Sequence, residues 1–132
     1  MGLFQEIFIW WNGQTMGTRF YTWRKGRQVG TDSHGNRYYV AKDGAKVGGY
    51  ERRWVIYNGP AEASLVPPEW HGWLHHTIDA LPAEQNYTPR EWEKPHLPNL
   101  TGTRHAYRPQ GSLLRGGERP AATGDYQAWR PE

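Results

Sequence analysis

The sequence predicts an α+β protein with an N-terminal amphipathic helix, a small antiparallel β-sheet of about three strands, one short helix and a long extended C-terminal tail with little regular structure. Three observations support this class. Apolar residues recur at helical spacing near the start, three runs of β-branched and aromatic residues lie between turn residues, and the final segment is rich in proline without Ile or Val. They divide the 132 residues into an N-terminal helix and linker (1–18), a core of sheet and helix (19–82) and a partner-wrapping tail (83–132).

The first expected element is a short helix over residues 3–11. Its apolar residues fall on one helical face: Leu3, Phe4, Ile7, Phe8 and Trp11. Asn12 and Gly13 then supply a helix stop. This helix could lie in a membrane interface, with Trp10 and Trp11 at headgroup depth, or pack on the protein's own core or on a neighbouring protein.

Residues 19–58 are interpreted as short antiparallel strands, because β-branched and aromatic residues alternate there with turn residues. The expected strands are 27–32, 37–41 and 53–57, with a hairpin turn at 33–36. Gly35 and Asn36 suit the positive φ of such a turn, and Gly48-Gly49 is expected to be a loop between strands. Three strands with one apolar face are about the minimum for an independently stable sheet.

A second amphipathic helix is expected to begin at Pro67-Pro68, because proline suits the first helical turn. Trp70, Trp73 and Leu74 follow at helical spacing, so that two indoles can dock on the sheet. The residues assigned to the structural core are Tyr38, Trp54, Trp70, Trp73 and Leu74.

The tail, residues 83–132, contains six prolines and five glycines. Such a composition cannot bury enough apolar surface on its own to offset the entropy of ordering it. Aromatic residues are nevertheless spaced along it: Tyr87, Trp92, Tyr107, Tyr126 and Trp129. We interpret the tail as an extended segment that becomes ordered on a large partner, the alternative being a floppy tail with stray aromatics.

Overall composition points to contact rather than to chemistry. Only 36% of residues are apolar, yet there are eight Trp and eight Tyr, the kinds of side chain enriched at protein interfaces. The chain has no cysteine, which excludes disulfides, thiolate nucleophiles and cysteine-ligated iron–sulfur clusters. Net charge is +3, and the positive charge is concentrated in residues 1–60, which carry nine Lys or Arg against four Asp or Glu. That half could face phosphates, an anionic membrane or an acidic protein surface.

No stretch approaches the roughly 20 apolar residues of a membrane-spanning helix. The start lacks a basic signal-peptide region, and Glu6 stands where a myristoylation signal carries Ser or Thr. The sequence therefore predicts a soluble or peripheral protein without a classical export signal.

Candidate chemical sites are few. His71 and His75 have the spacing that can share one metal ion, but a zinc site needs further ligands, so they are interpreted as polar residues of a packed helix. Glu69 beside His71 lacks the pocket and the orienting group that acid–base catalysis needs. Residues 44–49 and 116–117 match no nucleotide-binding loop. No catalytic residue, metal, cofactor or small-molecule substrate is predicted.

Nucleic-acid binding is the strongest competing function on composition. A calculated pI of about 9.3 and aromatic residues on a small sheet (Tyr38, Tyr39 and Trp54) could serve to stack bases. However, an acidic, proline-rich second half would repel phosphates, and no recognisable RNA-binding motif is present. A small basic RNA-binding module therefore stays only as a minor alternative.

A series of motifs occurs in order along the chain: residues 12–18 (NGQTMGT), 29–30 (VG), 35–39 (GNRYY), 53–57 (RWVIY), 66–75 (VPPEWHGWLH), 99–103 (NLTGT), 107–109 (YRP) and 126–131 (YQAWRP). Together they resemble the small A12-type accessory subunits of respiratory NADH:ubiquinone oxidoreductase (complex I), over about residues 10–131. Residues 66–75 are the most specific part of this resemblance. A complex I assembly factor is related to the same family.

The resemblance implies a supernumerary, non-catalytic subunit that stabilises the peripheral arm and its junction with the membrane arm. It implies an N-terminal helix near that junction, a small β domain on the quinone-proximal module and a tail over the iron–sulfur subunits. The implied location is peripheral on the inner membrane, on the cytoplasmic face in a bacterium or the matrix face in a mitochondrion. The assembly factor remains the alternative, although residues 101–103 and the aromatic tail favour the subunit.

The residues expected to bind partners lie in the first helix and the tail. They are Phe8, Trp10, Trp11, Trp92, Tyr107, Tyr126 and Trp129.

Overall fold

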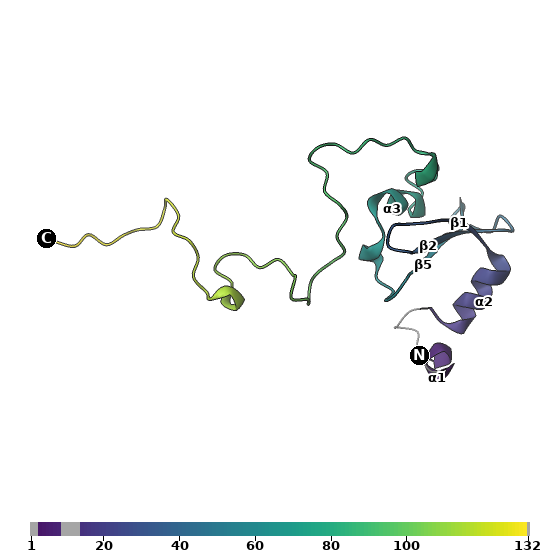
Figure 1. Ribbon diagram of the computed structural model, residues 1–132, viewed down its shortest axis with the longest axis horizontal. Helices are drawn as coiled ribbons and strands as arrows, with labels where there is room; N and C mark the ends of the chain where they lie inside the picture. Colours follow the sequence, from purple (N-terminus) through teal and green to yellow (C-terminus); the bar gives the residue numbers. More distant parts are fainter. Residues whose placement is uncertain (1–2, 9–13, 132) are drawn as a thin grey trace. The chain divides into compact units, whose positions relative to one another are not determined.

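A computed structural model describes residues 3–8 and 14–131 of the chain (Figure 1). Its internal contacts form two units, Met1–Asn99 and Leu100–Glu132. Helices and a small antiparallel sheet make up the described part of the first unit, which confirms the predicted α+β class. None of the helices in the described ranges is long and apolar enough to cross a membrane.

The first unit is built on a three-stranded antiparallel sheet in the order β1-β2-β5. The strands are β1 (Gly26–Thr31), β2 (Arg37–Ala41) and β5 (Arg53–Ile56), within one residue of the expected strands at each end. On the central strand, Tyr38 lies between Gly30 and Val55, while Tyr39 lies between Gln28 and Trp54. Because successive side chains alternate between the faces of a sheet, the Tyr38 and Tyr39 rings define its two faces.

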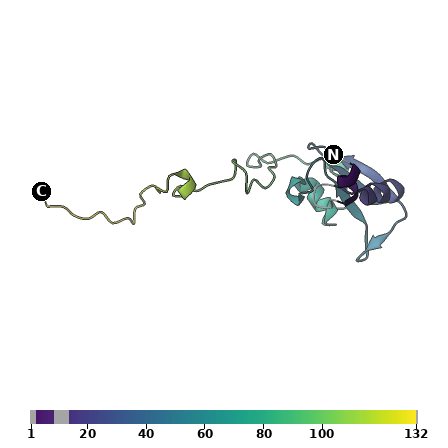
Figure 2. The same cartoon turned by 90° about the horizontal axis from the view of Figure 1, so that it is seen from below.

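A second, two-stranded sheet pairs β3 (Lys46–Val47) with β4 (Tyr50–Glu51). The loop expected at Gly48-Gly49 joins these two strands, and both glycines have positive φ values of 60° and 87°. Only glycine adopts such angles without strain, which explains the pair at the tip of the hairpin. The hairpin extends beyond the three-stranded sheet (Figure 2).

Helix α3 (Pro68–Leu74) begins at the proline pair as predicted, with Pro67 as its N-terminal cap. It covers the Tyr38 face of the sheet. The Trp70 ring stacks on the Tyr38 ring at a centroid distance of 3.9 Å and an interplanar angle of 6°, and Trp73 meets Tyr38 edge-on at 6.4 Å. These three rings are the centre of the core, in which Val66 is also buried.

Helix α2 (Met16–Lys25) was not expected, and it occupies the start of the region 19–58 that was interpreted as strands. Its first turn is capped by Thr15, whose hydroxyl oxygen accepts the Thr18 N–H at 3.2 Å. At the other end, the Lys42 ammonium donates to the Trp23 carbonyl at 3.3 Å, which satisfies one of the free carbonyls of the last turn. Caps at both ends therefore outweigh the strand propensity of its Thr and aromatic residues.

Helix α1 (Leu3–Phe8) lies where the first helix was expected. Trp10 and Trp11, which were expected to continue that helix and to contact a partner or a membrane, lie outside the described residues.

The loop between β1 and β2 is held by a partly buried polar network around Asp32. Its carboxylate accepts hydrogen bonds from the Tyr38 hydroxyl at 2.8 Å and from both the backbone and the side-chain amide of Asn36. Asn36 is 1% exposed, and it also accepts from the Asn58 N–H and donates to the Leu65 carbonyl. Burial alone would raise the pKa of Asp32, but these hydrogen bonds outweigh it and hold the pKa below its ordinary value.

Residues leading to the end of the first unit are tied to its core through Ser64. The His96 imidazole Nε2 lies 2.7 Å from the Ser64 carbonyl oxygen, and the Asn99 N–H donates to the Ser64 hydroxyl at 3.0 Å. The start of the partner-wrapping tail was expected at residue 83, and this boundary stays a prediction.

In the second unit, the described residues contain one 3₁₀ turn, η3 (Leu113–Arg115), and neither an α-helix nor a strand. The Arg119 guanidinium binds both carboxylate oxygens of Asp125, which closes a short loop. The rest of this unit is irregular chain.

Candidate partner interface

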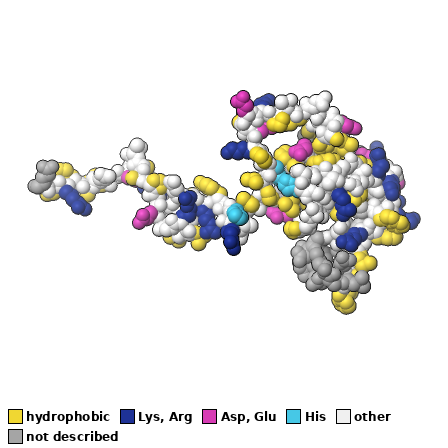
Figure 3. Space-filling model, viewed as in Figure 1, with side chains coloured by type: hydrophobic (Ala, Val, Ile, Leu, Met, Phe, Trp, Pro, Cys, Tyr) yellow, Lys and Arg dark blue, Asp and Glu magenta, His cyan; other side chains and the backbone are white. Residues whose placement is uncertain are grey.

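The aromatic residues predicted to bind partners are exposed wherever the structure describes them. Phe8 is 65% exposed, and the four in residues 92–129 range from 71% for Trp92 to 88% for Tyr107, with Tyr126 and Trp129 between them. Aromatic side chains bury a large area each, so exposed rings of this kind are poorly accommodated in water. Hydrophobic side chains lie at intervals along the second unit (Figure 3).

The residues assigned to the core lie on both faces of the sheet. Tyr38, Trp70 and Trp73 are buried together, and Leu74 packs against them at the edge of the same cluster. Trp54 instead lies on the opposite face, where its indole N–H donates to the Thr22 hydroxyl at 3.1 Å and so fixes α2 to the sheet.

Sequence reasoning missed an exposed apolar row on α2. Met16, Phe20 and Trp23 follow one another at intervals of four and three residues, and all three are exposed, Trp23 by 73%. The Phe20 and Trp23 rings lie 5.9 Å apart. Their helical spacing was the signal in the sequence, but it was obscured by the β-forming character of the neighbouring residues.

The tail carries further exposed apolar residues that were not singled out. Leu113 and Leu114 lie on the η3 turn and are 91% and 75% exposed, and Leu97 is exposed at the end of the first unit. Two adjacent exposed leucines on a tight turn form a small apolar protrusion. Like the aromatic residues of the tail, it is a candidate contact with a partner protein.

Helix α1 also presents apolar side chains. Phe4, Ile7 and Phe8 are exposed, and the rings of Phe4 and Phe8 lie 5.2 Å apart. Lys and Arg side chains gather over the side of the first unit seen in Figure 3. Exposed apolar rings and positive charge on the same unit fit either an acidic protein surface or an anionic membrane.

The histidines in α3 and just after it do not converge with other ligands in the part of the chain that the structure describes. The His71 and His75 rings lie 4.1 Å apart on the exposed side of the helix, and His76 stacks on Tyr50 at 5.0 Å. Across residues 3–8 and 14–131, no group of three or more His, Asp or Glu side chains is placed to hold a metal ion.

The comparisons with known proteins agree on one family. The family model described as NADH ubiquinone oxidoreductase subunit NDUFA12 matches residues 26–131, which leaves α1 and α2 outside the match. The NADH dehydrogenase (ubiquinone) 1 alpha subcomplex subunit 12 of Dictyostelium discoideum is 36% identical over 105 residues, covering 76% of this chain and 74% of the relative. Its counterpart in Bos taurus is 41% identical over 103 residues, covering 70% and 68%.

A bacterial relative also matches. An uncharacterized protein of Rickettsia prowazekii is 33% identical over 84 residues, covering 64% of this chain and 77% of the relative. The family match covers four fifths of the chain and includes all of the second unit except its last residue. The chain therefore belongs to the NADH ubiquinone oxidoreductase subunit NDUFA12 family.

Proposed function

We propose that this protein is a non-catalytic accessory subunit of respiratory complex I, associated with the enzyme at the inner membrane. The family match over residues 26–131 carries this proposal, because it includes both the folded core and the irregular tail. The Dictyostelium discoideum and Bos taurus relatives are named as subunits of NADH dehydrogenase, which favours a subunit over an assembly factor.

The role we propose is structural: the protein stabilises the peripheral arm of the enzyme and its junction with the membrane arm. In this proposal the tail lies over the quinone-proximal and iron–sulfur subunits, with Trp92, Tyr107, Tyr126 and Trp129 buried against them. Burying one large apolar side chain contributes roughly 1.5–3 kcal/mol, so four anchors can offset much of the cost of ordering a chain with little packing of its own.

Helix α1 is proposed to make the contact nearest the membrane. Its exposed Phe4, Ile7 and Phe8 can lie at the boundary between headgroups and acyl chains or against an apolar subunit surface. The helix has six residues, so any lipid contact would be shallow. The proposed face is cytoplasmic in a bacterium and the matrix face in a mitochondrion.

The proposal assigns no reaction to this chain. The carboxylate with the most developed polar environment, Asp32, accepts four hydrogen bonds that hold the β1–β2 loop, so its perturbed pKa has a structural cause. The ring faces considered for base stacking are also engaged within the fold. The Trp70 ring covers the Tyr38 ring. The rings of Tyr39 and Trp54 lie face to face at a centroid distance of 6.0 Å, and the Arg52 guanidinium lies 5.8 Å from the centroid of the Trp54 ring.

The proposal is tested by co-purification. The tagged chain is expressed in its own host, membranes are solubilised in mild detergent, and complexes are separated on a native gel stained for NADH dehydrogenase activity. Co-migration with the active, fully assembled enzyme supports the subunit role. Migration only with smaller, inactive assemblies would support the assembly-factor alternative, and recovery of the chain solely in the soluble fraction would refute both.

A further inference from the structure

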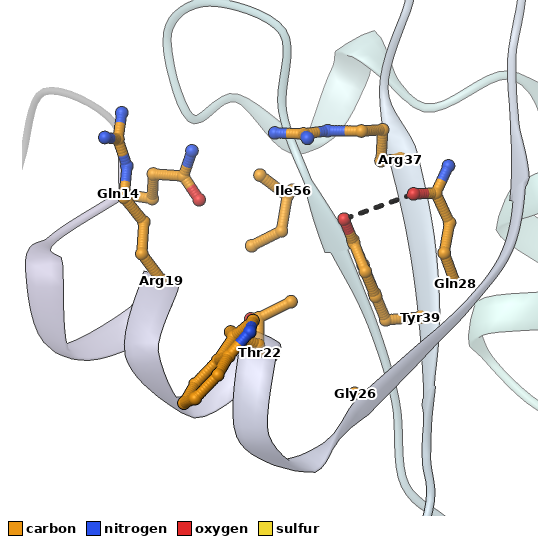
Figure 4. A pocket seen from close by; sticks show the side chains of 9 residues that line it. Gln14, Arg19, Thr22, Gly26, Gln28, Arg37, Tyr39 and Ile56 are labelled. Carbon is orange, nitrogen blue, oxygen red and sulfur yellow. Dashed lines mark hydrogen bonds between the residues drawn. The ribbon is translucent and has the colours of Figure 1, made fainter.

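An open cleft of about 650 Å³ lies between α2 and the Tyr39 face of the sheet (Figure 4). It is lined by Gln14, Arg19, Thr22, Trp23, Gly26, Gln28, Arg37, Tyr39 and Ile56. A volume in this range is typical of sites that enclose a small ligand or a short stretch of peptide.

The cleft opens beyond the point where the C-terminal end of α2 is fixed to the sheet. At that end Gly26 brings the backbone close to the helix, and a Cβ there would lie 2.5 Å from the Thr22 carbonyl oxygen. The bond from the Trp54 indole to the Thr22 hydroxyl closes the same end. Toward Gln14 and Arg19 the helix diverges from the strands, and the space between them opens (Figure 4).

The walls of the cleft are cationic and amide-bearing. Arg37 on β2 extends over Ile56, which is 4% exposed and forms an apolar floor, and Arg19 comes from α2 on the other side (Figure 4). The Arg37 side chain is exposed, and its guanidinium makes neither a hydrogen bond nor an ion pair within the described part of the chain. None of the nine lining residues is acidic.

One amide of the cleft is already oriented. The Gln28 carbonyl oxygen accepts the Tyr39 hydroxyl at 3.4 Å, and its amide nitrogen donates to the Thr31 hydroxyl at 3.1 Å. That arrangement holds the side chain in place beside Arg37 and leaves a second N–H of the Gln28 amide for a further acceptor.

We infer that this cleft receives a carboxylate-bearing segment of a neighbouring protein subunit, with an Asp or Glu side chain bound to the Arg37 guanidinium. The planar guanidinium matches a carboxylate in a two-point hydrogen bond, and the positive surplus of residues 1–60 attracts an acidic chain. The Ile56 floor and Trp23 wall suit an apolar side chain beside the carboxylate. A concave site with amides and an apolar floor fits a peptide better than a lipid headgroup, because anionic headgroups are bound by open clusters of Lys and Arg.

This inference rests on the proposed function, since it supplies a partner contact within the assembled enzyme. It is tested there first by site-specific crosslinking. The photoreactive amino acid p-benzoylphenylalanine replaces Trp23 in one tagged chain and Gln14 in another, so that both line the cleft and Arg37 is kept. The detergent-solubilised complex is then irradiated and analysed by mass spectrometry. Crosslinks from both positions to one Asp- or Glu-containing segment of another subunit support the inference. Crosslinks to lipid alone, to a segment without acidic residues, or to nothing overturn it.

Charge reversal supplies the second test. Arg37→Glu should increase the rate at which the chain is lost from the detergent-solubilised complex by about five- to tenfold at low salt, and less as salt screens the charges. Arg27→Glu is the matched control, because Arg27 is exposed on the same sheet but does not line the cleft. Thermal unfolding of each purified variant reports whether the fold is intact.

If the wild-type chain co-migrates with the enzyme, then equal loss of the two variants from the complex, or retention of both in it, refutes the inference. Failure of the wild-type chain to co-migrate refutes the proposed function instead, so that the two failures are distinguishable.

Discussion

Replacing Gly30 by Ala tests the arrangement at the centre of the core. A Cβ at Gly30 would lie 2.5 Å from Cη2 and 2.7 Å from Cζ2 of the Trp70 ring. Ordinary contact between carbons needs a separation of roughly 3.5–4.0 Å, so the ring would have to retreat by about 1 Å. It has little room to do so, because Trp70 is 5% exposed, lies 3.9 Å from the Tyr38 ring and meets Trp73 edge-on at 5.5 Å.

The expected cost of Gly30→Ala is that of overpacking a core, about 1–3 kcal/mol of unfolding free energy. For a domain of this size, each kcal/mol lowers Tm by about 4–8 °C. Because Gly30 does not have a positive φ, the loss would come from the contact with Trp70 rather than from backbone strain. Thermal unfolding of the full chain, followed by near-ultraviolet circular dichroism of its tryptophans, measures the change.

Gly17→Ala is the matched control for the same chemical change. Gly17 lies in α2, and a Cβ there would come no closer than 3.7 Å to the Thr15 hydroxyl oxygen. Alanine favours a helix over glycine by about 0.5–1 kcal/mol, so this variant should unfold at a slightly higher temperature. A Gly30→Ala chain that unfolds at the wild-type temperature would refute the stacked arrangement of Trp70 over β1.

Three further outcomes are expected. Replacing Tyr126 and Trp129 together by Ala should change the unfolding free energy of the isolated chain by no more than about 0.5 kcal/mol, yet weaken retention in the complex. Asp32→Asn should destabilise the fold at neutral pH. The pKa of Asp32 in the folded protein lies below its ordinary value of 3.8, so the ionised carboxylate stabilises the fold above pH 3.8. This stabilisation, which Asn lacks, fades as the pH falls through the folded pKa. His96→Ala should speed amide hydrogen exchange in residues 83–99 by releasing the contact with Ser64, at a cost of about 1 kcal/mol.

Each of these outcomes can be contradicted. A large loss of thermal stability in the doubly substituted tail would place those aromatics in the protein's own core. A constant difference between wild type and Asp32→Asn from pH 7 to pH 2 would exclude the proposed linkage. Unchanged exchange in residues 83–99 would show that Ser64 does not hold this segment.

The three main strands were predictable because local signals agreed with one another. Residues 37–41 combine β-branched and aromatic side chains with a preceding turn at Gly35, which has a φ of 83° in the structure. The same consistency held at Pro67-Pro68, where proline geometry and helical spacing both indicated the start of α3.

Helix α2 was not predicted, because the signals that determine it are weak or distant in sequence. Thr, Phe, Tyr and Trp are common in strands, and residues 16–25 contain all four types. The Lys42 contact with the Trp23 carbonyl and the Trp54 contact with Thr22 join residues 19 and 32 positions apart, so no local pattern reveals them.

The candidate interface was predictable in kind but not in extent. The aromatic spacing of the tail pointed to contact with a partner, since a segment without Ile or Val has too few apolar residues to bury these rings itself. The cleft beside Arg37 could not be predicted, because its residues come from α2 and the segment before it and from β1, β2 and β5. They meet only through the sheet register and the tilt of α2.

The most direct test of the central claim is the stoichiometry of this chain in purified, active complex I. Quantitative mass spectrometry with isotope-labelled standard peptides, on enzyme isolated through a tag on another subunit, gives the number of copies per enzyme. The account predicts one copy per active complex, retained through size-exclusion chromatography. A copy number far below one in the active fraction, with the chain concentrated in incomplete assemblies, would contradict it.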